Sequence, residues 1–350
     1  MKRYLYIYII AAISFIATSC SAYTHKELCE THREHAHRYH VEVVADYRYD
    51  WEENFIPGDP QNRTTWQIDW PSHYLDYESL RPTKPSGLRV INYGESGNYN
   101  VHNIPASGGI VDLYEGYNDI LFYNNDTEYI VFSRNDNGVT TRATTRTRTR
   151  ASYNGNIFAN EGEDEPTVNA PDMLFANYFE DYYAEKVLEP VKLPVTLQPL
   201  VFTYKIRYEF AEGLKYVALA QGALSGMAES VLLNTGETSE NTATILYDCE
   251  VTDYGVRAIV RSFGAPAFPN MNYPTRTENK HGLDLTVMLR NGKTISFQFD
   301  VTDQVAKQPH GGVIVVKGIV IEEDMGMQGT GSFDVEVDDW GEYEDIELPL

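Results

Sequence analysis

Short runs of alternating apolar and polar residues recur along most of the chain. In the first of them, apolar Val41, Val43 and Ala45 alternate with residues of the opposite face. A period of two is typical of a β-strand that buries one face. Further runs are 87–93, 99–104, 109–114, 119–123 and 128–133, with Gly, Asn, Asp and Pro between them. Short strands separated by such turns favour an antiparallel β-sandwich.

The second half of the chain has the same character. Strands are predicted at 201–210, 216–221, 230–233, 243–251, 256–263, 283–289, 294–300 and 313–321. Asn291 and Gly292 stand between two of these runs and predict a type I′ hairpin. Pro190, Pro194 and Pro199 restrict their segment to sheet edges or bends, because proline cannot donate to a ladder.

Residues 151–171 interrupt the alternation and contain the acidic run 161–165. The segment is too polar to bury, so it is predicted to be a loop or the edge of a domain junction. A chain of 350 residues exceeds the size at which one hydrophobic core usually keeps growing, so two domains are expected. The expected divisions are an N-terminal β-sandwich at 41–185, which includes the acidic loop 151–171, and a C-terminal β-sandwich at 186–350.

The end of the chain carries two further alternating segments. Phe333, Val335 and Val337 form one, and Ile346, Leu348 and Leu350 form the other. Strands with one apolar face need a partner to cover it. The partner is either the chain's own sandwich or a neighbouring subunit to which the strand is donated.

The first residues form an export signal. Lys2 and Arg3 precede an apolar run at 4–16, which is too short to span a bilayer, and small residues then lead to Cys20. This order predicts a lipoprotein signal peptide at 1–19 and acylation of Cys20, which would tether the mature protein to a membrane outside the cytoplasm. An ordinary cleavage site with an incidental cysteine is the alternative. The polar, His-rich segment 20–40 is then a flexible tether.

The charge balance excludes one class of partner. The formal net charge is −23, and removal of 1–19 makes it two units more negative. Binding of nucleic acid by phosphate neutralisation is therefore excluded. The five histidines of the tether are too loosely held to define a metal site, so no metal and no cofactor are predicted. Cys29 and Cys249 either pair or remain two thiols.

The segment 140–150 is unusually basic for this chain. Arg146, Arg148 and Arg150 share one face if the segment is extended. Such a row protects an edge strand against unwanted pairing. The functional alternatives are a docking surface for an acidic partner or glycan phosphate, and a site for a trypsin-like protease.

Catalytic motifs are missing from the sequence. It has no nucleophile elbow, no metalloprotease helix motif, no phosphate-binding loop and no Cys-x-x-Cys. We therefore predict a non-enzymatic protein. Aromatic residues near the start of the first domain, such as Tyr47, Tyr49 and Trp51, have two interpretations. They form either core packing or a stacking platform for a glycan.

Together these segments resemble the fimbrillin-like lipoproteins of Bacteroidetes, and more narrowly a branch beside the fimbrial anchor proteins. The resemblance rests on Cys20 and on the segments 46–51, 224–233, 299–305 and 335–340. It implies an all-β chain of two tandem transthyretin-like antiparallel β-sandwich domains. It also implies a protein that is lipid-anchored at the outer membrane, faces the cell surface and takes part in fimbria anchoring, assembly or adhesion, with fimbrial subunits or a host glycan as partner. A surface lipoprotein that binds glycans or other ligands is the alternative.

Overall fold

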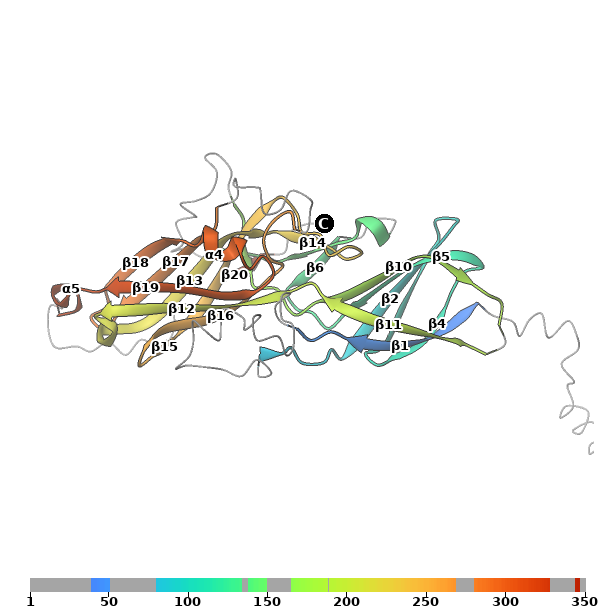
Figure 1. Ribbon diagram of the computed structural model, residues 1–350, viewed down its shortest axis with the longest axis horizontal. Helices are drawn as coiled ribbons and strands as arrows, with labels where there is room; N and C mark the ends of the chain where they lie inside the picture. The colour runs from blue at the N-terminus through green and yellow to red at the C-terminus, as the bar shows by residue number, and fades with distance from the viewer. Residues whose placement is uncertain are drawn as a thin grey trace, which may run out of the picture.

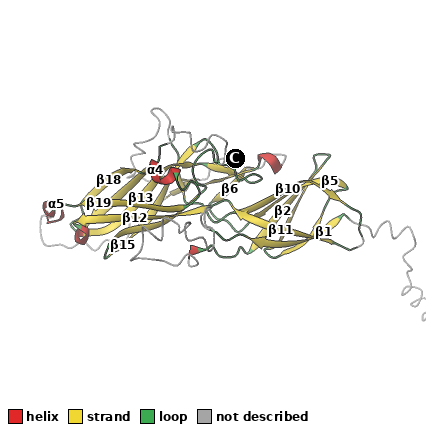
Figure 2. Cartoon of the chain, in the orientation of Figure 1, coloured by secondary structure: helices red, strands yellow, loops and turns green. Residues whose placement is uncertain are grey.

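The computed structural model describes residues 39–50, 80–133, 138–149, 165–187, 189–268, 280–327 and 344–346. Strands dominate these residues, and the α-helices among them are the short α4 (Thr302–Ala306) and α5 (Glu323–Met327) (Figure 2). The prediction of an all-β chain is confirmed. Two β-sandwiches lie end to end along the long axis of the molecule (Figure 1).

The first sandwich has a four-stranded and a three-stranded layer. Its strands are β1 (His40–Tyr47), β2 (Gly87–Gly94), β3 (Tyr99–Pro105), β4 (Gly108–Asp112), β5 (Gly116–Asn124), β10 (Phe175–Ala184) and β11 (Val191–Pro199). They pair in the order β3-β2-β5-β10 and β11-β1-β4. The layers join only where Phe175 and Ala176 of β10 meet Pro199 and Gln198 of β11. The rest of β11 does not pair with β10. Pro194 lies in this part of β11, and its nitrogen has no hydrogen to donate to a neighbouring strand.

The second sandwich repeats this plan. Its strands are β12 (Phe202–Glu212), β13 (Val217–Ala228), β15 (Thr242–Thr252), β16 (Gly255–Ser262), β17 (Gly282–Leu289), β18 (Thr294–Asp300) and β19 (Gly312–Val320). They pair in the order β18-β17-β13-β15 and β16-β12-β19. The β17–β18 connection carries Asn291 and Gly292, so the predicted hairpin is present. Its turn is not type I′, however, because Gly292 has a φ of 81° whereas Asn291 does not have a positive φ, and type I′ requires a positive φ at both residues.

The two sandwiches have the same topology. The strands of each sandwich can be numbered 1 to 7 in the order in which they occur in the chain. With this numbering, both sandwiches have one layer with the strand order 3-2-5-6 and one layer with the strand order 7-1-4. In both, strand 1 is parallel to strand 7 and antiparallel to strand 4. The sandwiches differ in the strand pair that connects the two layers. Strands 6 and 7 pair in the first sandwich, and strands 3 and 4 pair in the second. The chain therefore contains one fold twice, with parallel pairs that the alternating pattern did not predict.

Inward-facing side chains at every second position fill each sandwich. In β1 these are Val41, Val43 and Tyr47, whereas Val44 is exposed, as the sequence pattern predicts. The first core joins β1 to residues of both layers, such as Leu88, Ile120 and Leu193. The second core is larger and is built around Tyr204, Ile206 and Tyr208 of β12. In each case strand 1 contributes a central row of buried side chains.

A third core joins the two sandwiches. The small sheet β14-β7-β6 consists of β14 (Ser230–Leu232), β7 (Arg142–Thr145) and β6 (Ile130–Ser133), so it combines strands from both halves of the chain. Leu121 and Tyr123 of the first sandwich belong to the same buried cluster as Ala143 of this sheet and Val231 and Phe263 of the second half. The junction is thus a packed interior rather than a polar linker.

Three short strands extend the four-stranded layer of the second sandwich. β9 (Thr167–Asn169) pairs in parallel with β15, β8 (Thr147–Thr149) pairs with β9, and β20 (Glu344–Ile346) pairs with β8. The end of the predicted loop 151–171 therefore forms a strand. The expected boundary between residues 185 and 186 falls between β10 and β11, which belong to the same sandwich.

Candidate functional site

The arginine-rich segment does not form one continuous strand. β7 ends at Thr145 in the junction sheet, and β8 begins at Thr147 in the extension of the second sandwich. At the change of sheet, the backbone N–H of Arg146 donates to the oxygen of Tyr129, and the oxygen of Arg146 accepts from the N–H of Asn169. Arg146 is half-buried. The segment switches between sheets at Arg146, which the simple alternation of Arg and Thr does not reveal.

Two of the predicted site segments come together. β20 contains Ile346, and it pairs antiparallel with β8, so that Asp345 is in register with Arg148. The chain itself therefore supplies the partner strand for residues 344–346. Cys20, Arg150, Leu348 and Leu350 lie outside the described residues, as do the histidines at 25–37, Cys29 and the tryptophans at 51, 66 and 70.

Tyr47 and Tyr49, two of the aromatic residues proposed as a glycan platform, pack in the first core. Tyr47 is 5% exposed and donates a hydrogen bond of 2.9 Å to the backbone oxygen of Ala106. The rings of Tyr47 and Tyr49 both contact the ring of Phe175, with centroid distances of 5.4 and 5.7 Å. These two side chains are therefore structural, and the core interpretation holds for them.

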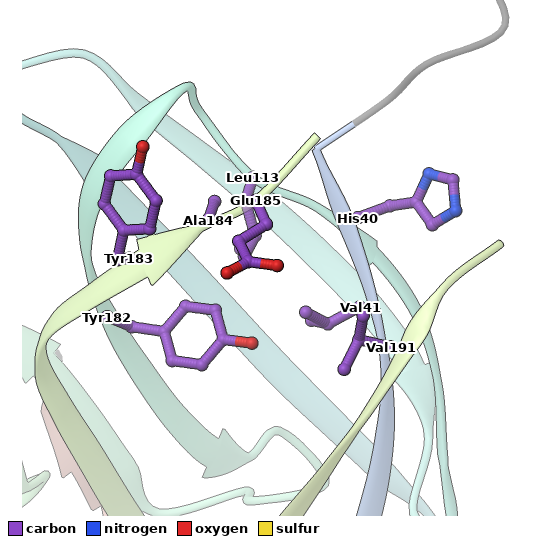
Figure 3. A pocket seen from close by; sticks show the side chains of 8 residues that line it. All are labelled: His40, Val41, Leu113, Tyr182, Tyr183, Ala184, Glu185 and Val191. Atoms are coloured by element: carbon purple, nitrogen blue, oxygen red, sulfur yellow. The ribbon is translucent and has the colours of Figure 1, made fainter. Parts of the chain in front are cut away.

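A pocket of about 280 Å³ lies where β1 and β11 begin and β10 ends. These strand ends are at the end of the first sandwich that is remote from the second (Figure 1). Strands β10 and β11 separate there, because their pairing is confined to the other end of β11. The lining residues come from the start of β1, the segment after β4, the end of β10 and the start of β11; they are His40, Val41, Leu113, Tyr182, Tyr183, Ala184, Glu185 and Val191. Figure 3 shows the carboxylate of Glu185 and the hydroxyl of Tyr182 directed toward Val41 and Val191, whereas the imidazole of His40 points away.

Tyrosines and carboxylates surround this pocket. Tyr117 and Tyr183 are 50% and 57% exposed, and their rings meet edge to face with centroids 5.2 Å apart. A hydrogen bond to Glu115 raises the pKa of Tyr39. Burial raises the pKa of Tyr182, and the carboxylate of Glu185 raises it further. We call the region that consists of Tyr39, Glu115, Tyr117 and the residues lining the pocket the tether end.

A second charged region lies on the outer face of the β16-β12-β19 layer. Lys205 is 1% exposed, and burial together with the charge of Arg257 lowers its pKa to about 8. Arg207 is hydrogen-bonded to Glu209, and Arg257 donates to Glu250 at 2.7 and 2.9 Å. The alternation of Tyr204, Ile206 and Tyr208 with Lys205 and Arg207 is the sequence signal for this face, and the sequence interpretation missed it.

The described residues give no sign of a metal centre or a membrane-spanning helix. Among them, no three His, Cys, Asp or Glu side chains are grouped so that they could hold a metal ion. No helix in the same part of the chain is long and apolar enough to cross a membrane. The candidate sites are therefore surfaces and a pocket.

The fold defines a class of protein: an all-β chain of two transthyretin-like sandwiches joined by a packed junction. The family model described as a domain of unknown function, DUF5119, matches residues 71–248, which reach from the first sandwich into β15 of the second. The chain belongs to this family.

Two relatives support the resemblance seen in the sequence. The chain is 24% identical over 307 residues to a Bacteroides ovatus protein named "Putative fimbrium anchoring subunit Fim4B", and the alignment covers 79% of this chain and 88% of the relative. The structure also resembles the crystal structure of a "putative adhesin" from Bacteroides ovatus, with a TM-score of 0.54 at 20% identity. That match covers 81% of this chain and 94% of the other, and it confirms the two-sandwich fold.

Proposed function

We propose that this chain is a lipid-anchored protein of the cell envelope that holds a fimbria to the outer membrane. The observation that carries the proposal is the alignment with a fimbrium anchoring subunit across 88% of that relative's length. The signal segment before Cys20 agrees with it, because an anchor needs an attachment to the membrane. The role is structural rather than catalytic.

The architecture suits a protein that transmits a load between two attachment points. We assign one domain to the strands β1–β5, β10 and β11, and the other to β12, β13 and β15–β19, so the domains meet after residue 199. The tether would leave from the outer end of the first domain, and the second domain lies at the opposite end (Figure 1). The junction core keeps the two ends at a fixed separation.

The second domain offers edges for a fimbrial subunit. β18 and β19 stand at the two ends of its strand order, and β20 adds a further strand from the end of the chain. Exposed edges bind partner strands through backbone hydrogen bonds. We assign the partner-binding surface to the arginine segment with Arg146, Arg148 and Arg150 and to the last residues, including Ile346, Leu348 and Leu350.

Replacement of the proposed lipidation site tests the attachment. Cells that produce the Cys20→Ser protein are expected to release it, and the fimbriae with it, into the medium, because the acyl chains are lost. The measurement is the fraction of fimbrial protein in the membrane pellet, together with metabolic labelling by a fatty acid. The control is Ser21→Ala, which leaves the cysteine in place. Membrane retention of an unlabelled Cys20→Ser protein would contradict the lipid attachment.

A truncated chain tests the partner surface in the same assay. A protein that ends at residue 343 lacks β20 and the last four residues, so it should remain in the membrane pellet while the fimbriae detach. Full retention of fimbriae by the truncated protein would show that the end of the chain only completes its own sheet.

A further inference from the structure

The pocket at the tether end has an aliphatic floor and a charged mouth. Val41 and Leu113 are buried core residues, whereas Val191, which lies on the inward-facing side of β11, is 47% exposed because the layers part there. The hydroxyl of Tyr182 and the carboxylate of Glu185 point over this floor (Figure 3). The site therefore offers contacts for methylene groups and, above them, a negative charge.

These groups suit a primary ammonium ion on a short aliphatic stem. The ammonium group donates three hydrogen bonds, and carboxylates and phenol oxygens accept them. Electron-rich tyrosine faces attract cations further, and Tyr182 and Tyr183 both line the pocket. The net charge of the whole chain is −23, which also favours the binding of a cation.

One exposed lysine, Lys186, directly follows the lining residue Glu185 in the chain. Lys192 follows Val191 in β11, so its side chain lies on the opposite, outward face of that strand. The surface thus places positive charge next to negative charge, which is the complement of a zwitterion with an ammonium and a phosphate. Exposed Tyr117 and Tyr183 add amphipathic rings of the kind that gather at the interface between a membrane and water.

The position of the pocket indicates where such a zwitterion comes from. Nineteen peptide units separate Cys20 from Tyr39, so even when fully extended they keep the tether end within about 65 Å of the lipid. The second sandwich lies at the other end of the molecule (Figure 1). We propose that the tether end contacts the bilayer, and that its pocket binds the headgroup of phosphatidylethanolamine, with the ammonium at Glu185 and Tyr182 and the phosphate toward Lys186.

The proposal rests on the lipid attachment proposed above, and its test works without the lipid. The full mature chain with Cys20→Ser is mixed with vesicles of phosphatidylethanolamine and phosphatidylcholine in equal parts, or of phosphatidylcholine alone, whose headgroup has no N–H. Flotation measures the bound fraction. We expect binding to the first vesicles, and a loss of about fivefold for Glu185→Gln, since a charge-assisted hydrogen bond is removed. Glu185 is exposed, so this variant keeps its fold.

A matched control is Glu323→Gln, which removes an exposed carboxylate from α5 in the second sandwich and should bind as the parent does. Soluble phosphoethanolamine should compete with the vesicles. Equal binding to both kinds of vesicle, or parental binding by Glu185→Gln, would overturn the proposal. Glu185-dependent binding of a lysine peptide without vesicle binding would also overturn it. Failure to label Cys20 with fatty acid refutes the lipid attachment alone and leaves this result unchanged.

Discussion

At the residue scale, His281 shows how the fold fixes the protonation state of a side chain. It precedes β17 and is 3% exposed, and its backbone N–H donates to the hydroxyl of Thr302 at 2.9 Å. Burial lowers the pKa of its imidazole to about 4, although the charge of Asp300 acts in the opposite direction. The native protein therefore holds a neutral histidine at a pH where the unfolded chain binds a proton.

This difference predicts a pH-dependent stability. Above pH 6.5 both states are neutral at His281, and between about 6.5 and 4 only the unfolded state gains the proton, so stability falls as the pH falls through this window. The loss attributable to this residue approaches about 3 kcal/mol. Urea unfolding at pH 7 and pH 5 measures the part of this loss that falls between those two pH values, about 2 kcal/mol. His281→Asn should reduce the difference between the two pH values, and an unchanged difference would contradict the assignment.

At the element scale, the carboxylate of Glu165 fastens the segment before β9 to the second sandwich. Glu165 accepts a hydrogen bond of 2.9 Å from the backbone N–H of Gly226 and one of 2.8 Å from the hydroxyl of Thr244. Gly226 has a φ of 76°, a conformation that glycine adopts without strain. The bonds fasten the segment before β9 to β13 and β15, and the parallel pairing of β9 with β15 follows directly.

Glu165→Ala should loosen this attachment. We expect hydrogen exchange at 167–169 to become at least about tenfold faster, since two hydrogen bonds to a charged group are lost. Exchange in the core strand β12 should not change. Glu237→Ala, which removes an exposed carboxylate elsewhere, is the matched control. Equal exchange of β9 in both variants would show that its backbone pairing alone is sufficient.

The success of the sequence interpretation also varies by element. Strands such as β1, β2 and β18 follow the local alternation of apolar and polar residues, so they were predicted nearly as they stand. β9 was missed because its acidic flank reads as a loop, and because Glu165 accepts hydrogen bonds from residues about 60 and 80 positions away. The pocket was missed for the same reason, because it arises from the separation of two strands, and no motif marks it.

At the scale of the whole molecule, the two sandwiches share a buried junction, and we expect them to unfold together. Its core takes Leu121 from the first sandwich and Val231 and Phe263 from the second half of the chain, and Val231 is 1% exposed. A buried interface of this kind couples the unfolding of its two sides, whereas a polar linker leaves domains independent.

Calorimetry tests this coupling. The parent protein should unfold in a single transition, and Val231→Asp should divide it into two, because a buried unpaired carboxylate disrupts the junction at a cost of several kcal/mol, on the order of 3. Val320→Asp is the matched control, since Val320 is 45% exposed on β19 and should leave one transition. Two transitions in the parent would show that the junction does not couple the halves.

The central place of β1 in its layer has a mechanical consequence. The strand runs along the long axis of the molecule, with β11 on one side over seven paired residues and β4 on the other (Figure 1). A pull between the N-terminal side of His40 and the far domain would act along β1, so its ladder bonds would be strained together in shear and would not peel apart one by one. The first strand after the tether is thus the element best placed to resist force.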